Sequence, residues 1–267
     1  MSKVVAIVSG GMDSVTLLKK LLVDGYEILV LNFSYGSKHN FMERRALLDV
    51  CDHLHVKAYL YDLPTTADQY IPSIHNAFQA VPLLESGLLK TGGEIPEGHY
   101  AEPTMKETVV PFRNGIMLAI AVGFAESHGA TAVYYGNHAG DHAVYPDCRG
   151  EFVLSMSQAA LKGTYEGIQI FSPFAGMTKA EIVKLGLEID APLHLTWSCY
   201  KGGNRPCLVC STCVERIQAF YDTGCIDPSL TGEEWAHGVA NMKKVIARFN
   251  EEYKDGFGRS EVSLDNT

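Results

Sequence analysis

The sequence predicts an α/β fold in which a parallel β-sheet carries helices on both faces. Strand-like and helix-like stretches alternate over residues 3–61, an order that favours parallel strands joined by right-handed crossovers. A glycine turn directly follows the first strand-like run, and four cysteines cluster after the last strand. The expected class is a Rossmann-like domain with a small metal-binding subdomain built on those four cysteines.

The first part of the chain supplies three strands. Residues 3–8 form a β-branched run typical of a buried strand, which Ser9-Gly10-Gly11 ends. Apolar residues then recur at helical spacing as far as Gly25, a common helix terminator. The next expected elements are a strand at 28–33, a helix at 40–53 and a strand at 56–61.

Residues 63–110 depart from this pattern. Five prolines and a Gly-Gly pair interrupt them, so we expect an irregular, lid-like insertion, with a plain surface excursion as the alternative. The regular pattern then resumes with helices at 113–129, 152–161, 178–185, 213–221 and 233–251 and strands at 132–135 and 168–171.

The domain organisation follows from these elements. We expect residues 1–190 to form the α/β domain, 191–223 a metal-binding subdomain packed on it, and 224–267 a helical tail. The length of 267 residues suits one large domain with such an appendage.

The composition of the chain limits the kinds of partner and environment that we expect for the protein. Lysine and arginine number 22 against 31 acidic residues, and the net charge of −9 disfavours direct binding to nucleic acid. No apolar run reaches ~18 residues and no signal peptide is evident, so we expect a cytoplasmic protein without a membrane span. Seven cysteines, an odd number, disfavour a disulfide framework.

The glycine turn, Ser9-Gly10-Gly11-Met12-Asp13-Ser14, has the features of an anion-binding loop. Its glycines let the backbone approach an anion, and the N–H groups of the following helix turn face it. A carboxylate such as Asp13 does not bind phosphate directly and so indicates a Mg²⁺ bridge. The loop lacks the Gly-Lys-Ser/Thr of a Walker motif, and a plain capped turn is the alternative.

Cys199, Cys207, Cys210 and Cys213 have the spacing C-x7-C-x2-C-x2-C. Four thiolates describe a closed tetrahedral Zn²⁺ site, which is structural because no position is left for water. Metal binding, worth ~10 kcal/mol or more in zinc peptides, orders a loop that has little core of its own. An iron–sulfur cluster and a redox pair are the alternatives.

Three polar stretches, 33–39, 110–114 and 136–149, surround the expected carboxyl edge of the sheet, where ligands bind in this class. Arg113 and Asn114 begin the apolar helix, where a helix cap and a surface charge are the alternatives. The density of His and Asp in 136–149 favours hydrogen bonding to a heterocycle over a metal site.

Two levels of resemblance follow. The glycine turn resembles the pyrophosphatase-type (PP) loop of the nucleotide α-hydrolase superfamily, whose members adenylate a substrate oxygen with ATP and release pyrophosphate. Val110-Pro111-Phe112-Arg113-Asn114, Tyr145-Pro146-Asp147-Cys148-Arg149 and the cysteines together resemble the 7-cyano-7-deazaguanine synthases, from about residue 3 to 221. Departures from the common form of that family, at Ser34, Ser37, Lys38 and 137–141, are expected to border the substrate pocket.

The resemblance implies an adenine nucleotide α-hydrolase-like fold and a carbon–nitrogen ligase of queuosine biosynthesis. Its reaction would convert 7-carboxy-7-deazaguanine and ammonia to the nitrile, through an acyl-adenylate and an amide, with ATP giving AMP and pyrophosphate. One structural Zn²⁺ per chain, Mg²⁺ with ATP, and a homodimer are also implied. The alternatives are a relative that uses another amine or stops at the amide, and a non-catalytic nucleotide-binding module.

The resemblance also implies site residues. The expected catalytic residues are Asp13, Arg113, Asp147 and Arg149. The expected ATP-binding residues are Val8, Ser9, Gly10, Gly11, Met12, Asp13, Ser14, Val15, Thr16, Leu17 and Leu18. The expected substrate-binding residues are Tyr35, His39, Asn114, Asp141, Tyr145, Asp147, Arg149, Lys162 and Lys179.

Overall fold

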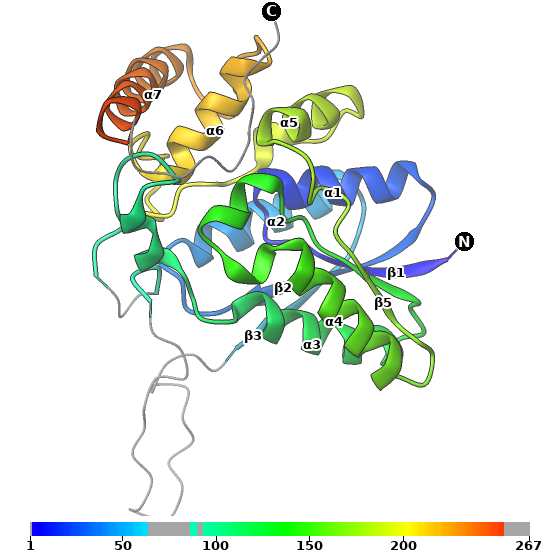
Figure 1. Ribbon diagram of the computed structural model, residues 1–267. Helices are drawn as coiled ribbons and strands as arrows, with labels where there is room; N and C mark the ends of the chain where they lie inside the picture. The colour runs from blue at the N-terminus through cyan, green and yellow to red at the C-terminus, as the bar shows by residue number, and fades with distance from the viewer. Residues whose placement is uncertain (1, 64–85, 90–92, 254–267) are drawn as a thin grey trace, which may run out of the picture.

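The computed structural model describes residues 2–63, 86–89 and 93–253 and shows one five-stranded parallel sheet (Figure 1). The strand order is β3-β2-β1-β4-β5, and the direction of winding reverses between β1 and β4. The strands are β1 (Lys3–Ile7), β2 (Glu27–Ser34), β3 (Ala58–Asp62), β4 (Ala132–Tyr134) and β5 (Gln169–Phe171). The α/β class expected from the sequence is confirmed.

Helices lie on both faces of this sheet. They are α1 (Met12–Val23), α2 (Asn40–His53), α3 (Arg113–Ser127), α4 (Gly150–Gly163), α5 (Lys179–Glu188), α6 (Ser211–Asp222) and α7 (Gly232–Glu252). Each corresponds to a helix expected from the apolar spacing, with ends that differ by a few residues.

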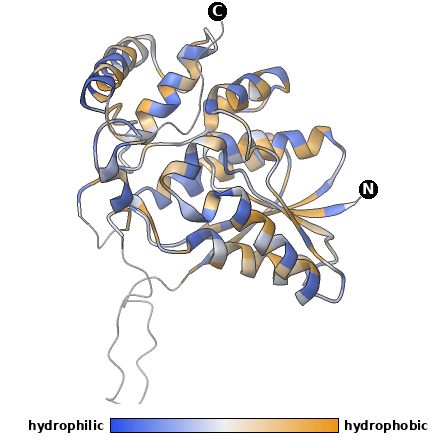
Figure 2. Ribbon diagram, in the orientation of Figure 1, coloured by the Kyte–Doolittle hydropathy of each residue, from blue (hydrophilic) through white to orange (hydrophobic). Residues whose placement is uncertain are grey.

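Neighbouring residues of β1 face opposite layers, because side chains alternate along a strand. Val5 packs in the core with residues of α3 and α4, whereas Ala6 packs in the core with residues of α1 and α2. Figure 2 shows this distribution, with hydrophobic positions concentrated between helices and sheet. The stretch Pro103–Ser127 is long and apolar enough to cross a membrane, but its α3 part packs on this sheet.

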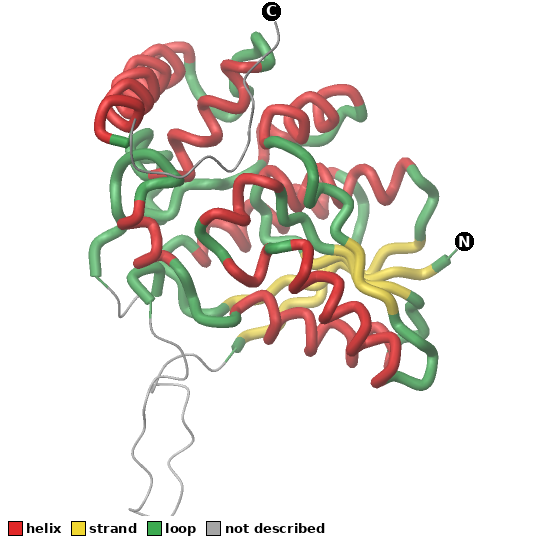
Figure 3. The backbone as a smooth tube through the Cα atoms, in the orientation of Figure 1, coloured by secondary structure: helices red, strands yellow, loops and turns green. Residues whose placement is uncertain are grey.

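The C-terminal helices extend the α/β domain. Phe220 of α6 and Val183 of α5 share one buried cluster, and Ile217 of α6 and Met242 of α7 share another. Figure 3 shows α6 and α7 as neighbours beside α5, at the upper left of the view. The cysteine segment is therefore joined to the α/β domain by apolar contacts. Residues 254–267 of the expected tail lie outside the described residues.

The described part of the insertion is irregular, as expected. Its only helical stretch there is a 3-10 turn at Pro103–Thr108, and isolated β-bridges pair Ser37 with Leu89 and Glu97 with Cys210. Residues 64–85 and 90–92 lie outside the described residues, so the expected lid is only partly described.

The turn between β1 and α1 lies directly on α2. Gly10 has a φ of +102°, and a Cβ at this position would lie 2.2 Å from the carbonyl oxygen of Glu43 and 2.9 Å from the amide nitrogen of Leu47. Both neighbours are backbone atoms of a helix and cannot move aside. Only glycine therefore allows the turn to approach α2 this closely.

We predict that Gly10→Ala destabilises the fold by about 3 kcal/mol or more, since the variant combines a left-handed backbone with a backbone clash. The matched control is Gly123→Ala in α3, where an added Cβ meets no atom within 4 Å. That change should be neutral or stabilising by up to ~1 kcal/mol. Urea denaturation of both variants measures the difference, and equal stability of the two would contradict the close approach.

Candidate active site

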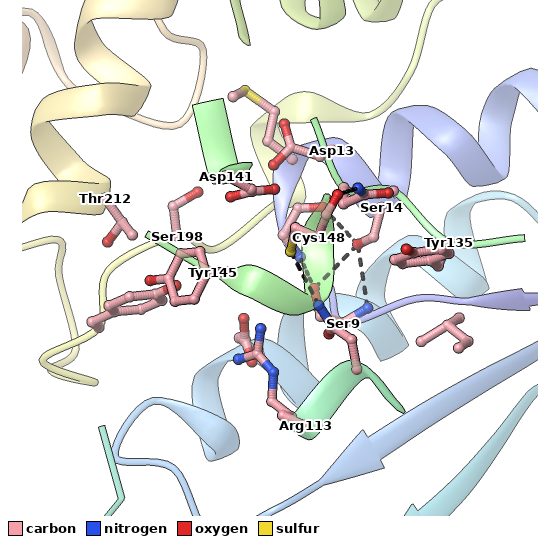
Figure 4. Close-up of a pocket in the computed structure, with 18 of the residues that line it drawn as sticks. Ser9, Asp13, Ser14, Arg113, Tyr135, Asp141, Tyr145, Cys148, Ser198 and Thr212 are labelled. Atoms are coloured by element: carbon pink, nitrogen blue, oxygen red, sulfur yellow. Dashed lines mark hydrogen bonds between the residues drawn. The ribbon is translucent and has the colours of Figure 1, made fainter. Parts of the chain in front are cut away.

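A cavity of about 220 Å³ opens where the winding of the sheet reverses, at the carboxyl ends of β1, β2 and β4. Figure 4 shows that its walls come from segments far apart in the sequence, including the loop after β1, the start of α3 and the loop after β4. Doubly wound sheets bind their ligands in this position.

The loop after β1 is preorganised by its two serines. The Ser9 N–H donates to Ser14 Oγ at 3.2 Å, and the Gly11 N–H donates to Ser9 Oγ at 3.1 Å (Figure 4). The Ser14 hydroxyl donates to the Gly11 carbonyl at 2.9 Å. The first bond of α1 joins the Val15 N–H to the Gly11 carbonyl, so the preceding N–H groups point out of the helix end toward an anion.

One end of the cavity carries charged side chains. Lys179 Nζ lies 3.0 Å from Asp13 Oδ2 and 2.9 Å from Glu215 Oε2. Burial acts to raise the pKa of Asp13, but Lys179 and His138 outweigh it and hold that pKa below its usual value. Burial acts to lower the pKa of Lys179, but Asp13 and Glu215 keep it above its usual value. Asp13 and Lys179 are thus a charged pair.

His138 completes this charged end. Its Nδ1 accepts from the Gly140 N–H at 3.0 Å. Its Nε2 lies 3.2 Å from Lys179 Nζ, 3.5 Å from Asp141 Oδ1 and 3.6 Å from Glu215 Oε1. Asp141, whose pKa burial raises, also accepts from the His138 N–H at 3.1 Å.

Asp13 has a carboxylate oxygen that can serve as a ligand for a divalent cation. Its Oδ1 is buried and has no hydrogen-bond partner within the described ranges, although Oδ2 is paired with Lys179. A buried carboxylate oxygen without a partner is costly, and a hard cation such as Mg²⁺ satisfies it. The loop therefore fits Mg²⁺ held through Asp13.

The other end of the cavity is lined by planar side chains. The Arg113 guanidinium stacks over the Tyr35 ring at 5.2 Å, and its Nη1 donates to the Tyr35 hydroxyl at 3.1 Å. The rings of His39 and Tyr200 stack at 4.7 Å. Tyr145 adds a further ring, and its hydroxyl lies 3.0 Å from Thr108 Oγ1. Flat groups on several sides suit a planar heterocycle.

His39 and Glu43 are both uncharged at this second end, where Arg113 carries a positive charge. The side chain of His39 is 1% exposed, and its Nε2 lies 3.4 Å from Glu43 Oε2. Burial lowers the pKa of His39 to about 3 and raises the pKa of Glu43 to about 8. At pH 7 the imidazole is therefore uncharged and the carboxyl is largely protonated.

Several expected site residues line the cavity: Val8, Ser9, Gly11, Met12, Asp13, Ser14, Tyr35, His39, Arg113, Asn114, Asp141, Tyr145 and Lys179. Others lie elsewhere. Val15, Thr16, Leu17 and Leu18 are buried inside the fold, where an amphipathic helix must place its apolar face. The backbone of Gly10 faces α2.

Asp147 does not face the cavity. Its Oδ2 accepts from the Asn114 N–H at 2.8 Å, so the carboxylate caps the start of α3 and complements the helix dipole there. Asn114 is consequently not the cap residue, and its Nδ2 donates to the Asp147 carbonyl and to Cys148 Sγ. The exposed Arg149 donates to the carbonyl of His142, and the exposed Lys162 lies in the last turn of α4.

The expected departures at Ser37 and Lys38 also lie outside the lining. Lys38 Nζ donates to the carbonyls of Gly87 and Gly93 and so ties the loop after β2 to the insertion. Ser37 is fully buried and bridges Leu89. These two positions shape the insertion.

Sequence reasoning missed several residues that line the cavity: Glu43, Ser198, Tyr200, Thr212 and Glu215. One signal was available for Glu43, because it follows His39 by four residues and such residues share a helix face. Tyr200 follows the first cysteine of the cluster directly.

The cysteine cluster is arranged for a metal ion. The four Sγ atoms lie within 4.8 Å of one another, and those of Cys207 and Cys213 are 3.9 Å apart. The N–H groups of Cys207 and Cys210 point at the sulfurs of Cys199 and Cys207, at 3.4 and 3.3 Å. Four sulfurs at such separations with N–H donors fit a closed tetrahedral site.

A buried ion pair anchors the same region. Arg216 donates to both carboxylate oxygens of Asp227, which is 0% exposed, and also to Thr196 Oγ1 and the Leu193 carbonyl. Burial acts to raise the pKa of Asp227, but Arg216 outweighs it and lowers that pKa. The pair thereby holds the segment that carries Trp197 and Ser198 into the cavity wall.

Comparison with known proteins gives a consistent result. Residues 3–224 match the family described as queuosine biosynthesis protein QueC. A 7-cyano-7-deazaguanine synthase from Archaeoglobus fulgidus is 41% identical over 247 residues, which cover 92% of this chain and 97% of that protein. One from Porphyromonas gingivalis is 44% identical over 225 residues, covering 84% of this chain and 94% of that protein.

We predict that Arg216→Met destabilises the protein by about 3–5 kcal/mol, because it leaves the buried Asp227 carboxylate unpaired. The control is Arg205→Met, which removes the more exposed pair with Glu234 and should cost at most ~1 kcal/mol. Chemical denaturation at pH 7 measures both.

The pH dependence of stability provides a second check on this pair. Since the folded-state pKa of Asp227 is lowered, its contribution is present above the ordinary value of 3.8 and is lost as pH falls through the folded-state pKa. Arg216→Met should weaken this acid dependence. An unchanged stability curve in the variant would show that the pair contributes nothing.

Proposed function

The chain belongs to the family of queuosine biosynthesis protein QueC, the 7-cyano-7-deazaguanine synthases, and we propose that its cavity forms a nitrile from 7-carboxy-7-deazaguanine and ammonia at the expense of ATP. The observation that carries the proposal is the division of one cavity into an anion-binding loop with charged neighbours and an end lined by planar side chains. The first part suits the phosphates of ATP, and the second suits the deazaguanine ring.

The proposed reaction has two activation steps. A carboxylate oxygen attacks the α-phosphorus of ATP, the bond to pyrophosphate breaks, and an acyl-adenylate forms. Ammonia attacks the acyl carbon, and AMP and one proton leave, which gives the amide. The amide oxygen then attacks a second ATP, pyrophosphate leaves, and loss of AMP and of both amide N–H protons gives the nitrile. No oxidant or reductant is needed.

The residues have distinct roles in this scheme. The N–H groups at the start of α1 and the hydroxyls of Ser9 and Ser14 hold the departing pyrophosphate. Arg113 offsets negative charge beside the reacting carboxylate, and its stacking on Tyr35 keeps the guanidinium in place. Lys179, once released from Asp13, is a further cation for the phosphates.

The scheme includes two metal ions. Asp13 would hold Mg²⁺, which when bound supplies positive charge to the phosphates. Cys199, Cys207, Cys210 and Cys213 would hold one Zn²⁺ per chain. That site is structural, because four thiolates leave no position for water or substrate. Tyr200 lies next to Cys199, so the ion would hold a wall of the planar end.

We also propose that the protein is a cytoplasmic homodimer that binds neither membranes nor nucleic acid. The edge strand β3 exposes Tyr59, Leu60 and Tyr61, which suits burial against a second copy of the chain. The net charge of −9 supports the absence of nucleic-acid binding.

The experiment that tests the reaction follows AMP and product together. With 7-carboxy-7-deazaguanine, ATP, Mg²⁺ and ammonium as the only amine, we expect two AMP for each cyano product and a transient amide, detected by chromatography and mass spectrometry. One AMP with a halted amide would identify an amide-forming relative. Turnover only after another amine is added would identify a conjugating one, and no pyrophosphate release would favour a non-catalytic module.

We predict that Asp13→Asn lowers kcat/KM for pyrophosphate release by about 100- to 1,000-fold, since it removes the negative charge that would hold Mg²⁺ at the phosphates. The fold should survive, because asparagine keeps the shape of the side chain. Asp24→Asn, at the exposed far end of α1, is the control and should leave turnover unchanged. Near-normal turnover of Asp13→Asn would mean that the cation is held elsewhere.

A further inference from the structure

Glu43 differs from every other carboxylate in the cavity wall. Within the described part of the chain the lining contains four carboxylates, those of Asp13, Glu43, Asp141 and Glu215. Lys179 pairs with Asp13 and Glu215, and the His138 N–H donates to Asp141. The Glu43 carboxyl makes no side-chain hydrogen bond to any described residue, and its Oε2 lies 3.4 Å from His39 Nε2.

This arrangement is costly unless a ligand completes it. The Glu43 side chain is 17% exposed. The positive charge that acts on it belongs to Arg113, whose guanidinium donates its hydrogen bond to the Tyr35 hydroxyl instead. A carboxyl group removed from water without a hydrogen bond costs on the order of 1–3 kcal/mol or more. A largely buried acceptor that faces a cavity and lacks a donor is a recognition element for donors on a ligand.

The neighbours of Glu43 define the shape of that ligand. Tyr35, His39 and Tyr200 line the same end of the cavity with flat surfaces, and His39 stacks on Tyr200 at 4.7 Å. The backbone of Glu43 lies directly behind the anion-binding loop, because its carbonyl oxygen is the atom nearest to a Cβ built at Gly10. A flat ring held by Glu43 is therefore in the same cavity as that loop.

We propose that Glu43 determines substrate specificity by accepting hydrogen bonds from the adjacent ring N–H and exocyclic amine of the deazaguanine. This inference rests on the proposed function, because it concerns the ring whose carboxylate is activated. The two donors are parallel and neighbouring, and the two oxygens of a carboxylate match them as a bidentate acceptor. The 7-deazahypoxanthine ring, which lacks the amine, offers only one of these two donors.

The protonation of Glu43 is in keeping with this role. In the absence of ligand, burial raises its pKa to about 8, although Arg113 opposes the shift. Two donated hydrogen bonds stabilise the ionised carboxylate, so the ring replaces the proton that burial otherwise retains. His39, whose pKa burial lowers, stays neutral beside it and adds no competing charge.

The test compares 7-carboxy-7-deazaguanine with its analogue that lacks the exocyclic amine. The rate measured is pyrophosphate release in the first adenylation, without ammonium. The wild-type protein should prefer the amino compound by ~10- to 100-fold in kcat/KM, the range expected for a charge-assisted hydrogen bond. Glu43→Gln keeps the shape but presents a donor, and it should lose most of that preference, chiefly through a higher KM for the amino compound.

Two further variants separate recognition from folding. Asp49→Asn, an exposed carboxylate on the same helix, should leave the preference unchanged. Glu43→Asp keeps the charge on a shorter side chain and should retain part of the preference, even if Glu43→Gln folds poorly. If folded Glu43→Gln preferred the amino compound as strongly as the wild-type protein does, the proposal would be overturned. An equal loss of kcat with both compounds would also overturn it, since that result describes acid–base catalysis.

A binding measurement distinguishes failure of the proposed function from failure of the recognition role of Glu43. If no pyrophosphate is released with either acid, calorimetry with 7-deazaguanine and 7-deazahypoxanthine still tests Glu43. A preference for 7-deazaguanine that Glu43→Gln abolishes supports the recognition role without the reaction. The absence of any preference in the wild-type protein overturns it.

Discussion

The approach of the β1–α1 turn to α2 is the constraint on which the cavity depends. Because Gly10 has no side chain, the anion-binding loop lies against the carbonyl of Glu43. One contact thus sets two parts of the site, the position of the loop and the position of Glu43 beside it. Parallel pairing of β1 with β4 supplies the third part, since it brings the loop after β4 to the same edge.

The elements that the sequence predicts well are those specified locally. The strand at residues 3–8, the glycine turn and the helix after it are neighbours in the chain, so the loop could be located from apolar spacing and residue type alone. The same holds for the cysteine cluster, whose spacing is contained in fifteen residues, from Cys199 to Cys213. The structure brings those four sulfurs together as expected.

The residues that sequence reasoning misplaced depend on contacts between distant segments. Asp147 was expected to bind the substrate, but its carboxylate is used to cap α3, which begins 34 residues earlier at Arg113. Phe112, with a φ of 52°, turns the chain into that helix, and no periodicity in the sequence indicates such a turn. Glu43 could be paired with His39 by spacing, but only the sheet order shows that this face of α2 meets the cavity.

The distribution of charge between the two ends of the cavity has a consequence for how ATP would bind. Asp13 and Glu215 outnumber Lys179 at the charged end, so that end repels phosphate unless cations accompany it. The planar end carries Arg113 beside the neutral His39 and Glu43, and so attracts a carboxylate. In the proposed reaction the acid therefore needs no metal to enter, whereas ATP enters as its Mg²⁺ complex. The reacting carboxylate and the α-phosphorus then meet between the two ends, where Arg113 and the start of α1 both contribute positive charge.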